Sequence, residues 1–258
     1  LPPGESALNI AHRGGAASAP ENTLVAFERT LRHRPDGIEL DIHLSRDGTI
    51  VVIHDALLAR TTGEAGEVSD FDHAHLATFN AAAFHPDENF QPIPTLREVL
   101  MLIESTAGYP IQYHIDIKLT HTGNRYELLE ETLVELLQEM NLIERSVIIS
   151  FDFPSLVRIG ELEPRLARGA LVGTQYMLRN TMSSSRAIAR EIAELGVDYV
   201  GVNHLFLTPA LYRSLRRQNL GIGAWTVNTL PQIRRMIAMG VDFITTDHPD
   251  LIPNLSSS

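Results

Sequence analysis

The chain has 258 residues, 44% of them hydrophobic and 21% charged, which is close to the ordinary usage of globular proteins. Its formal net charge of −11 argues against nonspecific binding to nucleic acid or to an anionic membrane surface. The absence of cysteine excludes disulfides, thiol catalysis and thiolate metal sites. No apolar run approaches the ~20 residues of a membrane span, so we expect no stable membrane insertion. The acidic charge favours a small-molecule substrate and no nucleic-acid partner. We expect a cytoplasmic location, with a periplasmic or secreted one as the alternative.

Strand-like runs alternate with helical stretches along the chain. β-rich residues recur at 7–11, 37–41, 50–53, 111–117, 146–150, 169–172, 199–202, 222–225 and 243–245. Helical periodicity is clearest over residues 23–33, 125–140, 183–195, 209–218 and 230–239. The alternation predicts an α/β protein built from βαβ units, a (β/α)8 TIM barrel, for which roughly 250 residues are typical.

One predicted strand is surplus for such a barrel. Residues 50–53 follow the second strand directly after a short turn, so we expect them to extend the top of that strand. Residues 57–91 show no long helical or strand pattern and contain glycine and proline, which indicates an excursion over the barrel mouth. No linker divides the sequence, and we predict one domain over residues 1–258.

Acidic residues stand at the ends of two neighbouring barrel strands, where the active sites of such barrels lie. Glu39 and Asp41 are two residues apart and therefore share one face of an extended chain, and Asp116 ends the next barrel strand. Like charges so close need a cation. Three carboxylates suit one divalent cation, Mg²⁺ or Ca²⁺, better than zinc.

Two histidines and two basic residues lie at the same predicted end of the barrel. His12 and His54 each follow an apolar strand and are suited to act as acid and base near neutral pH. Arg13 and Lys118, with the cation, supply positive charge for a phosphoryl group. Cleavage of a phosphodiester needs these parts: charge stabilisation of the non-bridging oxygens and two proton-transfer groups.

Other residues near the predicted site admit more than one role. Trp225, the only tryptophan, ends a strand, and we predict that it lines the substrate site together with Phe151. His114 shares the face of Asp116 and either lines the barrel or bonds a carboxylate. Glu21 and Asn22 follow a proline at a predicted helix start, where capping explains them.

Several short motifs occur in a characteristic order. The first are His12-Arg13-Gly14, Pro20-Glu21-Asn22-Thr23, Glu39-Leu40-Asp41, Asp47-Gly48 and His54-Asp55. The later ones are Arg60-Thr61-Thr62-Gly63, Ile93-Pro94-Thr95-Leu96, Ser150-Phe151, Trp225-Thr226-Val227-Asn228, Gly240-Val241-Asp242 and Thr246-Asp247. Over residues 8–252 the chain resembles the glycerophosphodiester phosphodiesterase family.

The resemblance implies a (β/α)8 barrel with a metal held at Glu39, Asp41 and Asp116. It also implies that His12 and His54 are the catalytic acid and base, and that Arg13 and Lys118 hold the phosphate. The chain departs from the family at its third carboxylate, which is usually glutamate and is here Asp116, shorter by one methylene. The shorter side chain leaves two alternatives, a changed metal identity, distance or affinity, or ligation through a bridging water.

The expected reaction is hydrolysis of a glycerophosphodiester, such as glycerophosphocholine, to sn-glycerol 3-phosphate and an alcohol. Attack by the glycerol 2-hydroxyl through a cyclic phosphate and direct attack by water at the metal are equal alternatives. A lysophospholipase D is the second candidate, in which an apolar groove is built from Phe71, Leu76, Phe79, Phe84 and Phe90 of the excursion. The third is a non-catalytic barrel that binds a phosphate metabolite, against which the intact histidine pair argues.

Overall fold

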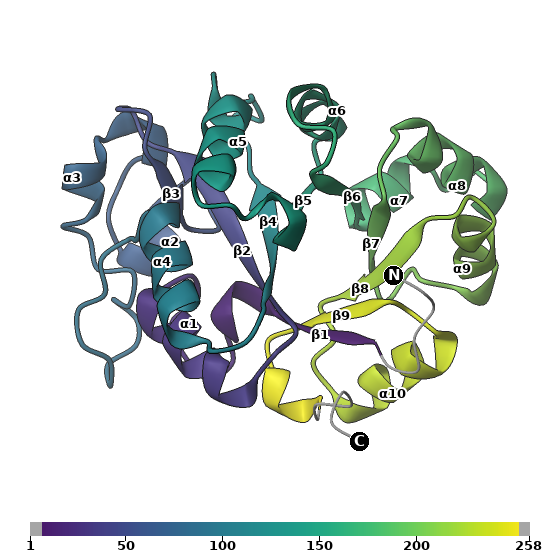
Figure 1. Cartoon of the computed structure of the whole chain (residues 1–258), viewed down its shortest axis with the longest axis horizontal. Helices are drawn as coiled ribbons and strands as arrows, with labels where there is room; N and C mark the ends of the chain where they lie inside the picture. The colour runs from purple at the N-terminus through teal and green to yellow at the C-terminus, as the bar shows by residue number, and fades with distance from the viewer. Residues whose placement is uncertain (1–6, 253–258) are drawn as a thin grey trace.

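Eight parallel strands close into a barrel in the computed structural model, which describes residues 7–252 (Figure 1). The strands are β1 (Leu8–Ala11), β2 (Gly37–Leu44), β4 (Gln112–Ile117), β5 (Ser146–Ser150), β6 (Ala167–Val172), β7 (Tyr199–Asn203), β8 (Gly221–Trp225) and β9 (Phe243–Thr246). Strand β1 pairs in parallel with both β2 and β9, which closes the barrel. The predicted TIM-barrel fold is confirmed, while the predicted single domain includes residues 1–6 and 253–258, which lie outside the described part.

Helices follow the strands and cover the outside of the barrel. They are α1 (Leu24–Thr30), α4 (Leu96–Thr106), α5 (Leu129–Glu139), α6 (Phe153–Leu162), α7 (Thr174–Arg179), α8 (Ser185–Glu194), α9 (Pro209–Arg216) and α10 (Leu230–Met239). Five of these were predicted, whereas α4, α6 and α7 were not. Helix α4 nevertheless carries a local start signal, because Thr95 and Glu98 form a reciprocal capping box. None of the helices within residues 7–252 is long and apolar enough to cross a membrane.

The surplus strand lies outside the barrel wall. Strand β3 (Ile50–Val52) pairs antiparallel with the last three residues of β2, so it lies beside the top of that strand as a hairpin partner and does not extend it, which corrects the prediction. The excursion that follows holds only the short helices α2 (Ala59–Thr62) and α3 (His73–Leu76) and a 3₁₀ turn at Val68–Asp70. Figure 1 shows it on the side of the molecule that carries β2 and β3.

The excursion has a small hydrophobic core of its own. Leu58, Val68 and Leu76 are fully buried in this core, and Phe71 and Phe79 pack against it. Three of the five residues predicted as a possible apolar wall for a lysolipid are therefore used in packing the excursion itself. The other two, Phe84 and Phe90, are exposed.

The strands of the barrel present alternate residues to its two faces. Leu40 and Ile42 of β2 belong to the large core between the barrel and its helices. Glu39 and Asp41 of the same strand line the interior cavity instead. Because all eight residues of β2 are buried, the strand places two carboxylates where only strong interactions offset the loss of hydration.

Candidate active site

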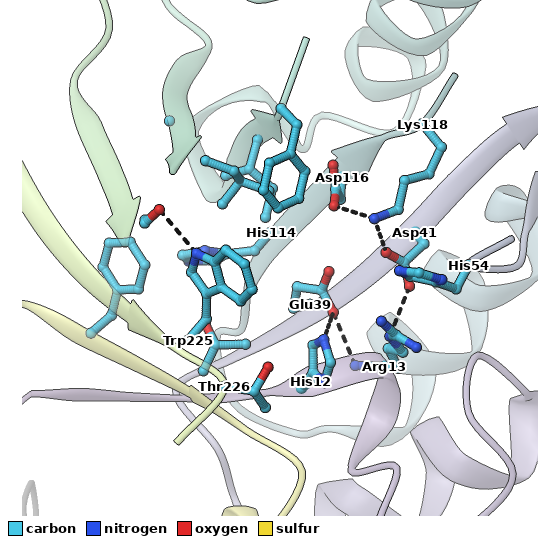
Figure 2. Close-up of a pocket in the computed structure, with 17 residues that line it drawn as sticks. His12, Arg13, Glu39, Asp41, His54, His114, Asp116, Lys118, Trp225 and Thr226 are labelled. Carbon is cyan, nitrogen blue, oxygen red and sulfur yellow. Dashed lines mark hydrogen bonds and ion pairs between the residues drawn. The ribbon is translucent and has the colours of Figure 1, made fainter. Parts of the chain in front are cut away.

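A cavity at the carboxyl ends of the strands collects every predicted site residue (Figure 2). Its lining includes His12, Arg13, Glu39, Asp41, His54, Asp116, Lys118, Phe151 and Trp225, together with His114 and Thr226. These residues come from β1, β2, β4, β5 and β8 or from the segments that directly follow the strands. The closure of the barrel therefore brings together side chains that are far apart in the sequence.

Three buried carboxylates form the centre of the cavity. Asp41 of β2 is paired in register with Asp116 of β4, and Glu39 lies two residues before Asp41 on the same face. One oxygen of each of the three lies within 4.8 Å of the others, and their residues are only 1–4% exposed. Such a cluster is unstable unless positive charge compensates it.

Two basic residues supply part of that charge. Lys118 Nζ lies 2.5 Å from Asp116 Oδ2 and 2.9 Å from Asp41 Oδ1. Arg13 Nε lies 3.3 Å from Asp41 Oδ2, and the Arg13 backbone N–H donates to Glu39 Oε2 at 3.0 Å. Burial alone would raise the pKa of Asp41, but Lys118 and Arg13 outweigh burial and hold this pKa far below its usual range.

The other two carboxylates are less well compensated. Burial, with the neighbouring charge of Asp41, raises the pKa of Glu39 to about 7. Burial also raises the pKa of Asp116, although Lys118 opposes the shift. Burial therefore favours the protonated form of both Glu39 and Asp116 when no further cation is near.

The cluster fits a hard divalent cation. Three carboxylates against the two charges of Arg13 and Lys118 leave one negative charge uncompensated. Within residues 7–252, Asp116 Oδ1 is buried and has no hydrogen-bond partner. Oxygen ligands that are buried, clustered and incompletely satisfied are those that Mg²⁺ and Ca²⁺ select in proteins.

A tight turn after β1 brings His12 and Arg13 into the cavity. Gly14 has a φ of +79°, and a Cβ there would lie 3.0 Å from the side chains of Ala26 and Phe27. Only glycine fits the turn without strain or a shift of α1. The motif His12-Arg13-Gly14 is thus a geometric unit: the glycine makes the turn, and the two preceding side chains face the carboxylates.

Each histidine is held by a carboxylate at Nδ1. The distance from His12 Nδ1 to Asp247 Oδ1 is 2.6 Å, and the distance from His54 Nδ1 to Asp55 Oδ1 is also 2.6 Å. Because an ionised carboxylate only accepts, Nδ1 carries a proton and Nε2 is turned to the cavity, where Nε2 of His12 lies 3.9 Å from Glu39 Oε2. Burial lowers the pKa of His12, but Glu39 and the hydrogen bond to Asp247 outweigh burial and raise this pKa overall.

An aromatic pair forms another part of the cavity wall. Trp225 and Phe151 meet edge to face with ring centroids 5.5 Å apart, and Trp225 Nε1 donates to the Gly201 carbonyl oxygen at 2.9 Å. A Cβ on Gly173 would lie 3.1 Å from Phe151 and 3.2 Å from Trp225. The glycine therefore leaves the space in which this aromatic pair packs.

His114, whose role the sequence left open, and His43 are both buried and neutral. His43 bonds the Tyr126 hydroxyl through Nδ1 and the His54 carbonyl oxygen through Nε2, so it supports the segment that carries His54. His114 lines the cavity and packs its ring on Phe243. Burial lowers the pKa of His43 and of His114 to about 4 in each case.

Sequence reasoning missed several supporting residues. Asn22 does not cap α1; Thr23 does so, and the Asn22 amide donates to Asp41 Oδ2 at 2.8 Å. Glu21 accepts from Arg13 Nη1 at 3.0 Å, so its role also lies in the site and not at the helix start. Asp247 stands in a motif block quoted for the family resemblance, which was the one signal available, but its partner His12 is 235 residues away.

The sequence model described as the glycerophosphoryl diester phosphodiesterase family matches residues 12–251. A putative glycerophosphodiester phosphodiesterase of Bacillus subtilis is 34% identical, over 94% of this chain and 95% of the relative. A glycerophosphodiester phosphodiesterase of Caldanaerobacter subterraneus is also 34% identical, over 96% of this chain and 97% of the relative.

Solved structures show the same fold. A putative glycerophosphoryl diester phosphodiesterase from Agrobacterium tumefaciens superimposes with a TM-score of 0.85 at 24% identity, covering 95% of both chains. A phosphodiesterase from Oleispira antarctica, solved in complex with the product sn-glycerol-3-phosphate, gives a TM-score of 0.77 at 24% identity and covers 98% of both chains.

Proposed function

The chain belongs to the glycerophosphoryl diester phosphodiesterase family, and from this premise we propose that it hydrolyses a glycerophosphodiester to sn-glycerol 3-phosphate and an alcohol. The observation that carries the proposal is the pair His12 and His54 in one cavity with three buried carboxylates. A barrel that only binds a phosphate needs no two histidines whose Nδ1 atoms are both fixed by carboxylates.

Glu39, Asp41 and Asp116 are the residues that would hold one divalent cation, Mg²⁺ or Ca²⁺. When bound, the cation supplies positive charge to the non-bridging phosphoryl oxygens. Lys118 is paired with both Asp41 and Asp116, so these two carboxylates already offset part of the positive charge that it can offer to a substrate. A phosphoryl group in the cavity would be held by Lys118 and by the Arg13 guanidinium.

The histidines would move the protons of the reaction through Nε2. One histidine, neutral with Nε2 unprotonated, removes the proton of the attacking hydroxyl. The other, in its imidazolium form, donates its Nε2 proton to the alcohol oxygen as the bond of that oxygen to phosphorus breaks. The attacking hydroxyl is either the glycerol 2-hydroxyl, which gives a cyclic phosphate that water then opens, or water itself. Trp225 and Phe151 would offer an apolar surface beside the phosphate, against which the glycerol carbons of the substrate would pack.

The test is release of sn-glycerol 3-phosphate from glycerophosphocholine in EDTA and then with Mg²⁺ or Ca²⁺ added. We expect turnover that a cation restores and that His12→Ala and His54→Ala each reduce by at least about a hundredfold, as loss of an acid–base group does. No turnover with either cation would contradict the proposal. Faster turnover of lysophosphatidylcholine than of glycerophosphocholine would assign the site to a lysophospholipase D instead.

A further inference from the structure

Arg60 projects from the excursion onto a groove beside the active-site cavity. The groove and the cavity share His54 and Lys118 in their linings, and Arg60 lies on the groove side. Its helix, α2, is anchored by Leu58, which is fully buried in the core of the excursion. The backbone that carries Arg60 is therefore held by the excursion.

The guanidinium of Arg60 bridges two carboxylates. Its Nη1 and Nη2 donate to the two oxygens of Glu21 at 3.0 and 2.6 Å, and its Nε donates to Asp55 Oδ2. The planar fork of arginine serves both partners at once, which the single point charge of lysine cannot do. Each carboxylate is thereby fixed in position and orientation from the side of the excursion.

Both carboxylates also hold a residue of the proposed chemistry. Asp55 Oδ1 accepts from His54 Nδ1 at 2.6 Å. Glu21 Oε1 accepts from Arg13 Nη1 at 3.0 Å. One side chain of the excursion is thus connected on one side to an acid–base histidine and on the other to the arginine that would hold the phosphate.

We infer that Arg60 is a positioning residue, through which the excursion fixes His54 by way of Asp55 and Arg13 by way of Glu21. The inference deepens the proposed function and rests on it. The excursion then contributes to the reaction indirectly. Its small core holds α2, and Arg60 of α2 holds Asp55 beside His54 and Glu21 beside Arg13. Arg60 itself contacts neither of the reacting groups.

Steady-state hydrolysis of glycerophosphocholine by Arg60→Ala and Arg60→Lys is the first measurement. We expect kcat/KM of R60A to fall about tenfold to a hundredfold, as when a residue that orients a reacting group is lost. R60K should recover part of the loss, because it can serve one carboxylate but not both. Wild-type constants for R60A would overturn the inference.

Arg97→Ala is the matched control. Arg97 forms the same two-pronged pair with Glu139, at 2.8 and 2.6 Å, and its side chain is 47% exposed against 46% for Arg60. Neither Arg97 nor Glu139 lines the cavity. R97A should therefore keep wild-type kcat and KM. If kcat/KM of R97A fell as far as that of R60A, the effect at Arg60 would be no more than that of losing any surface ion pair, and the inference would fail.

The two arms of the connection are separable. Asp55→Asn should mainly lower kcat, because Asp55 orients a histidine that moves protons. Glu21→Gln should mainly raise KM, because Glu21 orients Arg13. R60A should show both changes. Wild-type kcat and KM in both Asp55→Asn and Glu21→Gln would contradict the inference.

Chemical rescue distinguishes positioning from a general structural role. Truncation at Arg60 opens a half-exposed space between two carboxylates, which a free guanidinium ion can enter. Guanidinium below unfolding concentrations should restore activity of R60A several-fold, while sodium chloride at equal ionic strength should not, and R97A should not respond. Absence of rescue in a folded R60A protein would count against positioning.

The ring nitrogens of His54 give a readout that does not need turnover. In the wild type, ¹⁵N NMR should find the His54 proton on Nδ1, where it is donated to Asp55. R60A should lower the population of this tautomer, and an unchanged population would overturn the inference. A wild type that hydrolyses no glycerophosphodiester would end the proposed function, while this measurement would still decide the role of Arg60.

Discussion

At the scale of single residues, the site depends on what holds each reacting group. Asp247 bonds His12 through Oδ1, accepts from the Asn228 amide through Oδ2, and its own backbone N–H donates to Asn228 Oδ1 at 2.9 Å. This carboxylate is therefore locked in place before it orients the histidine. Alternation along one strand predicted that Glu39 and Asp41 share a face, and Asp116 was predicted from its place at the end of the next barrel strand. Asp247 was not predicted, because only barrel closure between β1 and β9 brings it to His12.

Asp247→Asn tests this residue. We expect kcat to fall about tenfold to a hundredfold with little change in KM, because the substrate contacts remain while His12 loses its fixed orientation. The carboxylate also raises the pKa of His12, so the limb of the pH–rate profile that belongs to His12 should move to lower pH. Unchanged kcat together with an unmoved pH profile would show that Asp247 has no such role.

At the scale of elements, the strands were predictable because their apolar runs are short, β-branched and bounded by glycine or charge. Strand β5 was predicted to the residue, and helix α10 likewise. Helix α4 was missed although Leu96, Val99, Leu100 and Ile103 recur with helical period, since the excursion before it has no pattern of its own. The other four predicted helices were given bounds that are too long. For α1 the reason is that Thr23 caps its start and a 3₁₀ turn replaces its predicted last residues.

The excursion is also the element whose stability should be most separable. Leu58→Ala removes a fully buried side chain from the core of the excursion. We expect it to lower the free energy of unfolding by about 2–5 kcal/mol. Its neighbour Leu57 is 49% exposed, so Leu57→Ala should cost well under about 1 kcal/mol. Urea unfolding of the two variants checks the difference. Equal losses would mean that this small core does not hold the excursion.

At the scale of the whole molecule, the barrel concentrates negative charge that its own basic residues do not fully compensate. The closure that forms the site also removes Glu39, Asp41 and Asp116 from water. The sequence predicted the barrel and these carboxylates, but not the degree of compensation, because Arg13 and Lys118 reach the cluster only once β1, β2 and β4 lie side by side. Stability and cation binding should therefore be coupled through one carboxylate.

Glu39 makes the sign of that coupling testable. Its folded pKa is raised to about 7 from 4.5, so the folded state keeps a proton that the unfolded chain releases, and this contribution to stability is lost as pH rises through 7. His43 and His114 act in the opposite direction, because their folded pKa values are lowered to about 4 and stability is lost as pH falls below 6.5. The total pH dependence therefore mixes both effects, and the informative comparison is between the wild type and Glu39→Gln.

Glutamine at position 39 imitates the protonated acid. In EDTA above pH 7, we expect E39Q to unfold at a higher temperature than the wild type, and the difference to shrink toward pH 4.5. Added Mg²⁺ or Ca²⁺ should stabilise the wild type by about 2.7 kcal/mol at a hundred times its Kd, with a gain that grows with pH because the cation replaces the proton of Glu39. E39Q should respond weakly and without that pH dependence. Equal cation responses in the two proteins at every pH would mean that Glu39 does not ligate the metal, and the cluster would then have to bind it through Asp41 and Asp116 alone.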